Sequence, residues 1–156
     1  MRKILNPFTK DSDYKCFGCS PKNEHGLKLE FYEDGEYVIS SWEPVDYLQG
    51  YINVLHGGIQ TTLLDEIASW TVNVKAKTAG VTSNINISFK KVVYINKGII
   101  KLKCKLIEIK RNIAILSAEL YDSEDVLCTK AEIHYFLFKP EIAKAKNLYP
   151  GYENFF

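Results

Sequence analysis

Residues 54–74 have the sequence VLHGGIQTTLLDEIASWTVNV, and the prediction of the fold depends mainly on the pattern of this stretch. Five apolar residues recur in it at steps of four, four, three and four: Ile59, Leu63, Ile67, Trp70 and Val74. At about 100° per residue these side chains share one face of an α-helix. The stretch therefore predicts a helix of about 20 residues that starts at the glycine pair after His56 and is closed by Gly80.

Apolar and polar residues alternate on both sides of this helix, with the period of two that is typical of strands. Before it, residues 27–31 and 37–41 flank a Glu-Asp-Gly turn and predict a hairpin. After it, turn residues such as Asn96-Lys97-Gly98 separate four alternating runs, which we expect to form an antiparallel meander: 81–93, 99–110, 113–121 and 126–138. Residues 140–156 show no period, so we assign them no structure, although their aromatic side chains could dock on the body or on a partner.

A single long helix and these strands predict an α+β fold in which one curved antiparallel sheet of about six strands wraps the helix. We expect one domain over residues 1–156, with its core at about 15–139 and a C-terminal tail at 140–156. A sheet of this kind has an edge strand with unpaired backbone groups, and pairing across a two-fold axis would cover it. We therefore expect a homodimer, or a dimer of dimers.

Composition narrows the classes of partner and location. Lys and Arg number 20 against 19 Asp and Glu, so no overall field would draw nucleic acid or an acidic membrane. The first residues lack the apolar core of a leader peptide, and no later stretch reaches about 18 uninterrupted apolar residues. The 4 cysteines are too scattered for a disulfide framework. These features predict a cytoplasmic protein that binds neither nucleic acid nor membrane.

Two glycines, Gly57 and Gly58, stand at the start of the predicted helix. Glycine in a helix lowers stability by roughly 1 kcal/mol relative to alanine, so a functional or structural role is expected for the pair. The free N–H groups of a helix N-terminus favour negative charge, and glycine lets a ligand approach the backbone closely. The pair could therefore stabilise an oxyanion. A glycine turn that merely caps the helix is the structural alternative.

Asp65 lies about 200° around the predicted helix from Leu63 and Ile67, opposite the apolar row. On a solvent-facing stripe it would be an ordinary surface carboxylate. Because the sheet wraps this helix, however, its far side should face a cleft or a second subunit. There Asp65 could act as a nucleophile or as a base that activates water.

The run from Gln49 to Glu66, QGYINVLHGGIQTTLLDE, resembles the Q-G-x4-H-G-G-x6-D-E segment of the phenylacetate-pathway-type branch of hotdog-fold thioesterases. Cys16-Phe17-Gly18-Cys19, followed by Asn23 and Gly26-Leu27, is similar to an N-terminal stretch of many such proteins. The resemblance covers about residues 15–139. It implies a hotdog fold and hydrolysis of acyl-CoA, or a related acyl thioester, to a free carboxylic acid and a thiol without a metal or cofactor.

The resemblance also implies roles for particular residues. Asp65 is the expected catalytic carboxylate, and the Gly57 N–H is expected to polarise the thioester carbonyl from the other subunit. Thr82 is expected to orient the attacking water, with Ser83 one step away. Gln49 matches a polar position of the family, and His56 is expected to shape the loop or contact the thioester; an ordinary loop histidine is the alternative.

We group Gly58, Glu66, Ser83, Lys90 and Lys91 as candidate substrate-binding residues. The lysines could meet the phosphates of coenzyme A, although solvated strand-end lysines are the simpler alternative. Glu66 points about 100° away from Asp65, so we do not treat the two as an acid/base dyad. Val92 departs from the family, which usually has proline at this position, and this leaves the local strand path open.

Other chemistries remain as alternatives. Cys16 and Cys19 could be half of a zinc site, with His25 as a further ligand, but no second pair matches them and we expect no metal. A hotdog hydratase or dehydratase would use a different arrangement of His and Asp or Glu. A non-catalytic acyl-CoA-binding module or ligand sensor is compatible with the same fold.

Overall fold

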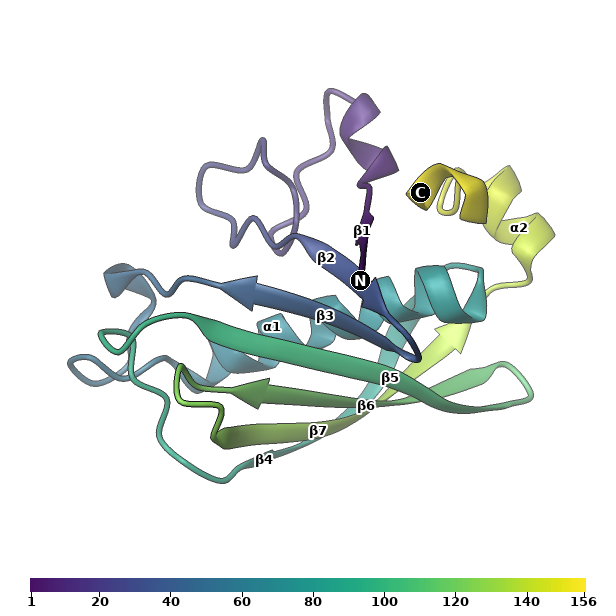
Figure 1. Ribbon diagram of the computed structural model, residues 1–156. Helices are drawn as coiled ribbons and strands as arrows, with labels where there is room; N and C mark the ends of the chain where they lie inside the picture. Colours follow the sequence, from purple (N-terminus) through teal and green to yellow (C-terminus); the bar gives the residue numbers. More distant parts are fainter.

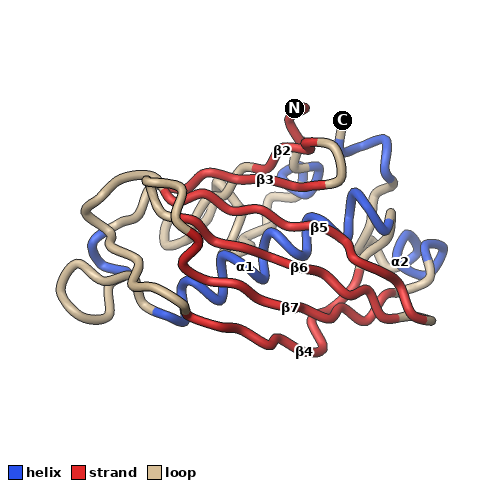
Figure 2. Tube along the Cα trace, turned by 60° about the horizontal axis from the view of Figure 1, so that its bottom comes forward, coloured by secondary structure: helices blue, strands red, loops and turns tan.

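The computed structural model describes residues 1–156 and places one long helix against a seven-stranded antiparallel sheet (Figure 1). Helix α1 runs over Gly57–Thr71 and continues as a π-helical turn over Val72–Ala76. The strands are β1 (Arg2–Ile4), β2 (Phe31–Asp34), β3 (Tyr37–Trp42), β4 (Gly80–Phe89), β5 (Ile100–Lys110), β6 (Ile113–Tyr121) and β7 (Leu127–Leu137). The predicted hotdog arrangement is confirmed, with the helix lying across one face of a curved sheet (Figure 2).

The strand order corrects the predicted meander. It is β1-β2-β3-β5-β6-β7-β4, so β4 pairs with β7 at the far edge and not with β5. Asn96-Lys97-Gly98 therefore belongs to a crossover between β4 and β5, with Gly98 at a φ of +112°, and not to a hairpin. Turn residues set the local backbone angles, but they do not determine which strand comes next in a sheet.

Two further boundaries differ from the prediction. Gly80 begins β4 and does not close the helix, which ends where Lys77 adopts a left-handed φ of +55°. The first strand of the hairpin begins at Phe31 and not at Leu27, because the N–H groups of Leu27 and Leu29 donate to the carbonyls of Phe17 and Gly18. Residues 27–30 therefore pair with the loop that carries Cys16 and Cys19.

The core lies between α1 and the inner face of the sheet. The helix buries Leu63, Leu64, Ile67, Ala68 and Trp70. Alternate residues of β6 and β7 face it, and several are alanines, which let the helix approach the sheet closely: Ala114, Leu116, Ala118, Leu120, Ala131, Ile133 and Tyr135. None of the helices is long and apolar enough to cross a membrane.

The N-terminal and C-terminal segments cover the end of α1, and they form structure that the sequence pattern did not predict. Strand β1, the 3-10 turn Pro7–Lys10, helix α2 (Pro140–Ala145) and the 3-10 turn Tyr152–Phe155 all lie there. The Leu5 N–H donates to the Phe155 carbonyl at 2.9 Å. The Phe155 ring is fully buried and packs edge-on against Trp70, so the C-terminal aromatic side chains dock on the body of the same chain.

Candidate active site

Asp65 is half-buried on α1, and its side chain faces the two strands at the β4 edge of the sheet. Its Oδ1 accepts hydrogen bonds from the Thr82 hydroxyl at 2.8 Å and from the Tyr135 hydroxyl at 2.7 Å. The Tyr135 hydroxyl also lies 2.9 Å from the Asp65 carbonyl. Two donors thus fix the carboxylate through one oxygen. Oδ2 accepts no hydrogen bond from the protein and is available to a ligand.

A β-bulge places Thr82 beside this carboxylate. Thr82 lies opposite Tyr135 in the β4–β7 ladder, whereas the next pair is Asn84 with His134. Ser83 is the extra residue, and its hydroxyl donates to the His134 carbonyl at 3.1 Å. A bulge shifts the alternation of side chains along a strand. Thr82 can therefore share the inner face of β4 with Ile85, although the two are three residues apart.

Tyr135 is the residue of this cluster that sequence reasoning missed. It is buried on β7 and follows Ala131 and Ile133 on the inner face. Burial, with the nearby negative charge of Asp65, raises the pKa of Tyr135 well above its usual range, so its hydroxyl remains a donor. A buried tyrosine normally needs a hydrogen-bond partner for its hydroxyl, and this requirement could have marked Tyr135 as a candidate site residue. The sequence did not reveal that the partner is Asp65.

The start of α1 is capped by His56. Its Nδ1 accepts a hydrogen bond from the Gly58 N–H at 2.9 Å, and its carbonyl accepts from the N–H groups of Ile59 and Gln60. The Gly57 N–H is therefore the first-turn amide without an acceptor in the loop or cap. A Cβ on Gly57 would meet only the Phe89 ring, at 3.5 Å, whereas a Cβ on Gly58 would press on His56 Nδ1 at 3.0 Å.

Gln49 supports the loop before the helix. Its Oε1 accepts a hydrogen bond from the Asn53 N–H at 2.9 Å, where Asn53 has a φ of +61°. A Cβ on the next residue, Gly50, would come into van der Waals contact with His56. Within the chain, Gln49 thus holds the loop that positions His56 and hydrogen-bonds to no other candidate residue.

Lys90 and Lys91 follow directly after Phe89, whose ring lies near Gly57. Their N–H groups both donate to the Cys128 carbonyl, which ends the β4 ladder and holds the two residues beside β7. Neither ammonium pairs with a carboxylate of the protein. Two exposed lysines therefore follow the residue whose ring lies beside the N-terminus of α1. Val92 is exposed and lies after β4 has ended at Phe89.

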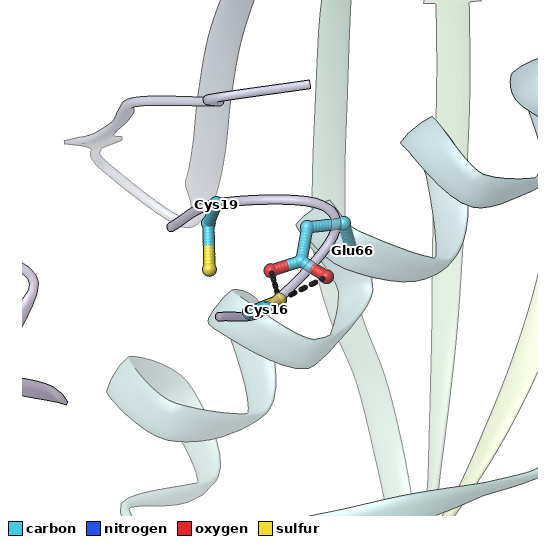
Figure 3. Close-up of side chains that lie close together, drawn as sticks. All are labelled: Cys16, Cys19 and Glu66. Atoms are coloured by element: carbon cyan, nitrogen blue, oxygen red, sulfur yellow. Dashed lines mark hydrogen bonds between the residues drawn. The ribbon is translucent and has the colours of Figure 1, made fainter. Parts of the chain in front are cut away.

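Glu66 faces away from this cluster, as its position on the helix predicts. Its carboxylate accepts a hydrogen bond from Trp70 Nε1 at 3.1 Å and lies 3.5 Å from Cys16 Sγ, beside Cys19 (Figure 3). Burial, with the adjacent Cys16 charge, raises the pKa of Glu66 to about 7. The proximity of the Cys19 thiol lowers the pKa of the Cys16 thiol. His25 lies outside this group.

The candidate site thus combines a positioned carboxylate, an open helix N-terminus and two exposed lysines that follow Phe89. Residues 52–129, half of the chain, match the family model described as the thioesterase superfamily. The chain belongs to the thioesterase superfamily. The matched residues include Gly57, Asp65 and Thr82, whereas Cys16, Cys19 and Tyr135 lie outside them.

Solved structures support the same fold. A Streptococcus mutans protein bound to acetyl-CoA is 20% identical with a TM-score of 0.65, covering 72% of this chain and 90% of its own. A hypothetical thioesterase of Streptococcus pneumoniae with coenzyme A has the same four values. Zebrafish thioesterase superfamily member 2 is 20% identical with a TM-score of 0.67, covering 76% of this chain and 88% of its own. No curated protein matches the chain.

Proposed function

We propose that this thioesterase-superfamily protein hydrolyses acyl-CoA, or a related acyl thioester, to a free carboxylic acid and a thiol. The observation that carries the proposal is the Asp65 carboxylate, which Thr82 and Tyr135 hold through Oδ1 while Oδ2 stays open. The streptococcal structures with bound acetyl-CoA and coenzyme A support this class of substrate.

In the proposed reaction Asp65 acts as a general base. Oδ2 takes a proton from a water molecule, and the water oxygen forms a bond to the thioester carbonyl carbon. The carbonyl oxygen becomes an oxyanion, which an N–H at a helix start stabilises. The tetrahedral intermediate then collapses with loss of the C–S bond. The thiolate takes up the proton that Asp65 had removed from the water, and the carboxylic acid leaves.

We propose that each site combines two subunits. Gly57 and Asp65 are eight residues apart on α1, which separates them by about 12 Å of helix rise, too far for both to touch one carbon. Strand β4 is an edge strand paired only with β7, and it carries exposed apolar side chains, including Val81 and Phe89. Pairing of β4 with its copy would cover this edge and bring two α1 helices together.

Lys90, Lys91 and Gly58 are assigned to substrate binding. Lys90 and Lys91 are proposed to bind coenzyme A phosphates, because they are exposed, unpaired and follow Phe89, whose ring lies beside the helix start that receives the carbonyl. The exposed Gly58 backbone allows the thioester to approach His56 closely.

The direct test is a panel of acyl-CoA esters, from acetyl to long-chain and aryl, incubated with the full chain. Free coenzyme A should be quantified by chromatography, because the partly exposed Cys16 thiol of the protein would also react with thiol reagents. We expect release with at least one class of acyl group. Tight binding across the panel without release would overturn the proposal in favour of a ligand sensor.

A further inference from the structure

A second cluster of reactive side chains lies behind Asp65, where the N-terminal loop crosses α1. Cys16 and Cys19 come from this loop and Glu66 from the helix (Figure 3). One sulfur or oxygen atom from each of the three residues lies within 4.8 Å of the others. Proposed catalysis uses none of these side chains, so their convergence needs a separate explanation.

The distance between Cys16 and Glu66 matches that of neighbouring ligands in a tetrahedral metal site, and the Cys19 ligand atom lies within 4.8 Å of both. Zinc bonds of about 2.3 Å to sulfur and 2.0–2.2 Å to oxygen place neighbouring ligand atoms about 3.5–3.8 Å apart. Cys16 Sγ lies 3.5 Å from Glu66 Oε1 and 3.6 Å from Oε2. Two thiols and a carboxylate are also ligands that zinc accepts, whereas magnesium and calcium prefer oxygen alone.

The surroundings hold the ligands in place. Trp70 Nε1 donates to Glu66 Oε1 and orients the carboxylate from the helix side, and the Asn6 side chain donates to the Cys19 carbonyl at 3.3 Å. Outer contacts of this kind usually support metal ligands. Gly18, between the cysteines, leaves the carboxylate the space that a Cβ would occupy.

Either the Tyr14 hydroxyl or a water molecule could occupy the fourth coordination position of the metal. The Tyr14 hydroxyl lies 2.9 Å from Cys19 Sγ. A cavity of about 370 Å³ is lined by Tyr14, Cys16 and Glu66 and extends to Val81 at the start of β4, so water can also enter. Three protein ligands with water in the fourth position is the open zinc arrangement that is typical of catalytic sites.

We propose that Cys16, Cys19 and Glu66 bind one zinc ion, which clamps the N-terminal loop to α1 next to Asp65. The ion fastens the loop to the residue that follows the catalytic carboxylate. The proposal does not depend on thioester hydrolysis, and its test measures metal.

The full chain, purified under reducing conditions, should be dialysed against zinc and its metal content measured. We expect one zinc per chain. Replacement of zinc by cobalt should give an absorption band from thiolate-to-metal charge transfer. This band should weaken in Cys16→Ser and Cys19→Ser, and in Glu66→Gln it should require a higher cobalt concentration. Loss of a ligand should weaken zinc binding by more than the 10–100-fold that a supporting contact contributes, as a rough guide.

A further variant and two controls distinguish loss of a zinc site from a general loss of folding. Gly18→Ala keeps all three ligands but places a methyl group on the Glu66 carboxylate, so zinc affinity should fall. Gly50→Ala, where a Cβ meets nothing closer than 3.7 Å, and Cys128→Ser should bind zinc like the native protein. If Cys16→Ser unfolds, Gly18→Ala and Glu66→Gln still decide the question.

Other outcomes would overturn the proposal. The reduced native chain could take up no more zinc than a Cys16→Ser, Cys19→Ser double variant. Alternatively, the cobalt protein could lack the thiolate band. Mass spectrometry of the unreduced protein could also show a disulfide between Cys16 and Cys19 while the reduced form binds no metal, which would make the pair a redox element.

Discussion

The Thr82 hydroxyl on β4 lies 2.8 Å from Asp65 Oδ1 on α1, and Tyr135, directly across the β4–β7 ladder from Thr82, donates to the same oxygen. One cross-strand pair therefore fixes one carboxylate. This relationship makes the contributions of the three side chains separable by substitution.

We expect Asp65→Asn to abolish most turnover while the melting temperature stays nearly unchanged. Asparagine is close to isosteric and retains an oxygen that can accept from Thr82 and Tyr135, but it cannot take a proton from water. Steady-state rates and thermal unfolding should be measured on the same preparation. Retention of more than about a tenth of the rate would remove Asp65 from the catalytic role, because general-base contributions are usually about 10²–10⁴-fold.

Tyr135→Phe should lower kcat by roughly 10-fold or more, the scale of a hydrogen bond to a charged group, while KM changes little. Because the pKa of Tyr135 is raised by burial, the hydroxyl stays protonated throughout the neutral and mildly alkaline range. The alkaline limb of the pH–rate profile should therefore have the same midpoint in Tyr135→Phe. A shifted midpoint would mean that Tyr135 itself titrates during the reaction.

The fold and the site were accessible from sequence to different degrees. The 3.6-residue period of α1 placed Ile67 and Trp70 in the core and Asp65 on the opposite side, because one helix face depends only on local spacing. Tyr135 lies 70 residues from Asp65, and no local pattern links them. Strict alternation would also have put Thr82 on the face opposite Ile85; only the bulge at Ser83 reverses this.

Mixing two inactive parents should restore activity if the site is shared between subunits. One parent carries Asp65→Asn and the other Gly57→Leu, whose Cβ the chain can accommodate beside Phe89. Each mixed dimer would have one site with native Gly57 and native Asp65. Activity and subunit exchange should be followed together, the latter by native mass spectrometry. Complete exchange without activity would show that the site lies within one chain.

Lys90→Gln together with Lys91→Gln should raise KM for acyl-CoA and leave kcat nearly unchanged, because the phosphates lie far from the reacting carbon. The same variant should process a phosphate-free acyl thioester of N-acetylcysteamine as the native protein does. Lys110→Gln on β5 provides a control for loss of surface charge. Equal losses with both substrates would indicate a structural effect and contradict a role in phosphate binding.

The pairing of β4 with β7 also affects folding of the chain during its synthesis. Helix α1 and β4 leave the ribosome well before β7, the ladder partner of β4, which ends only at Leu137. At about 5–20 residues per second, the roughly 40 residues between the two strands take several seconds to synthesise. During that interval β4 exposes both hydrogen-bonding edges and its apolar residues. We expect nascent chains stalled before β7 to recruit chaperones and those that include it to be released.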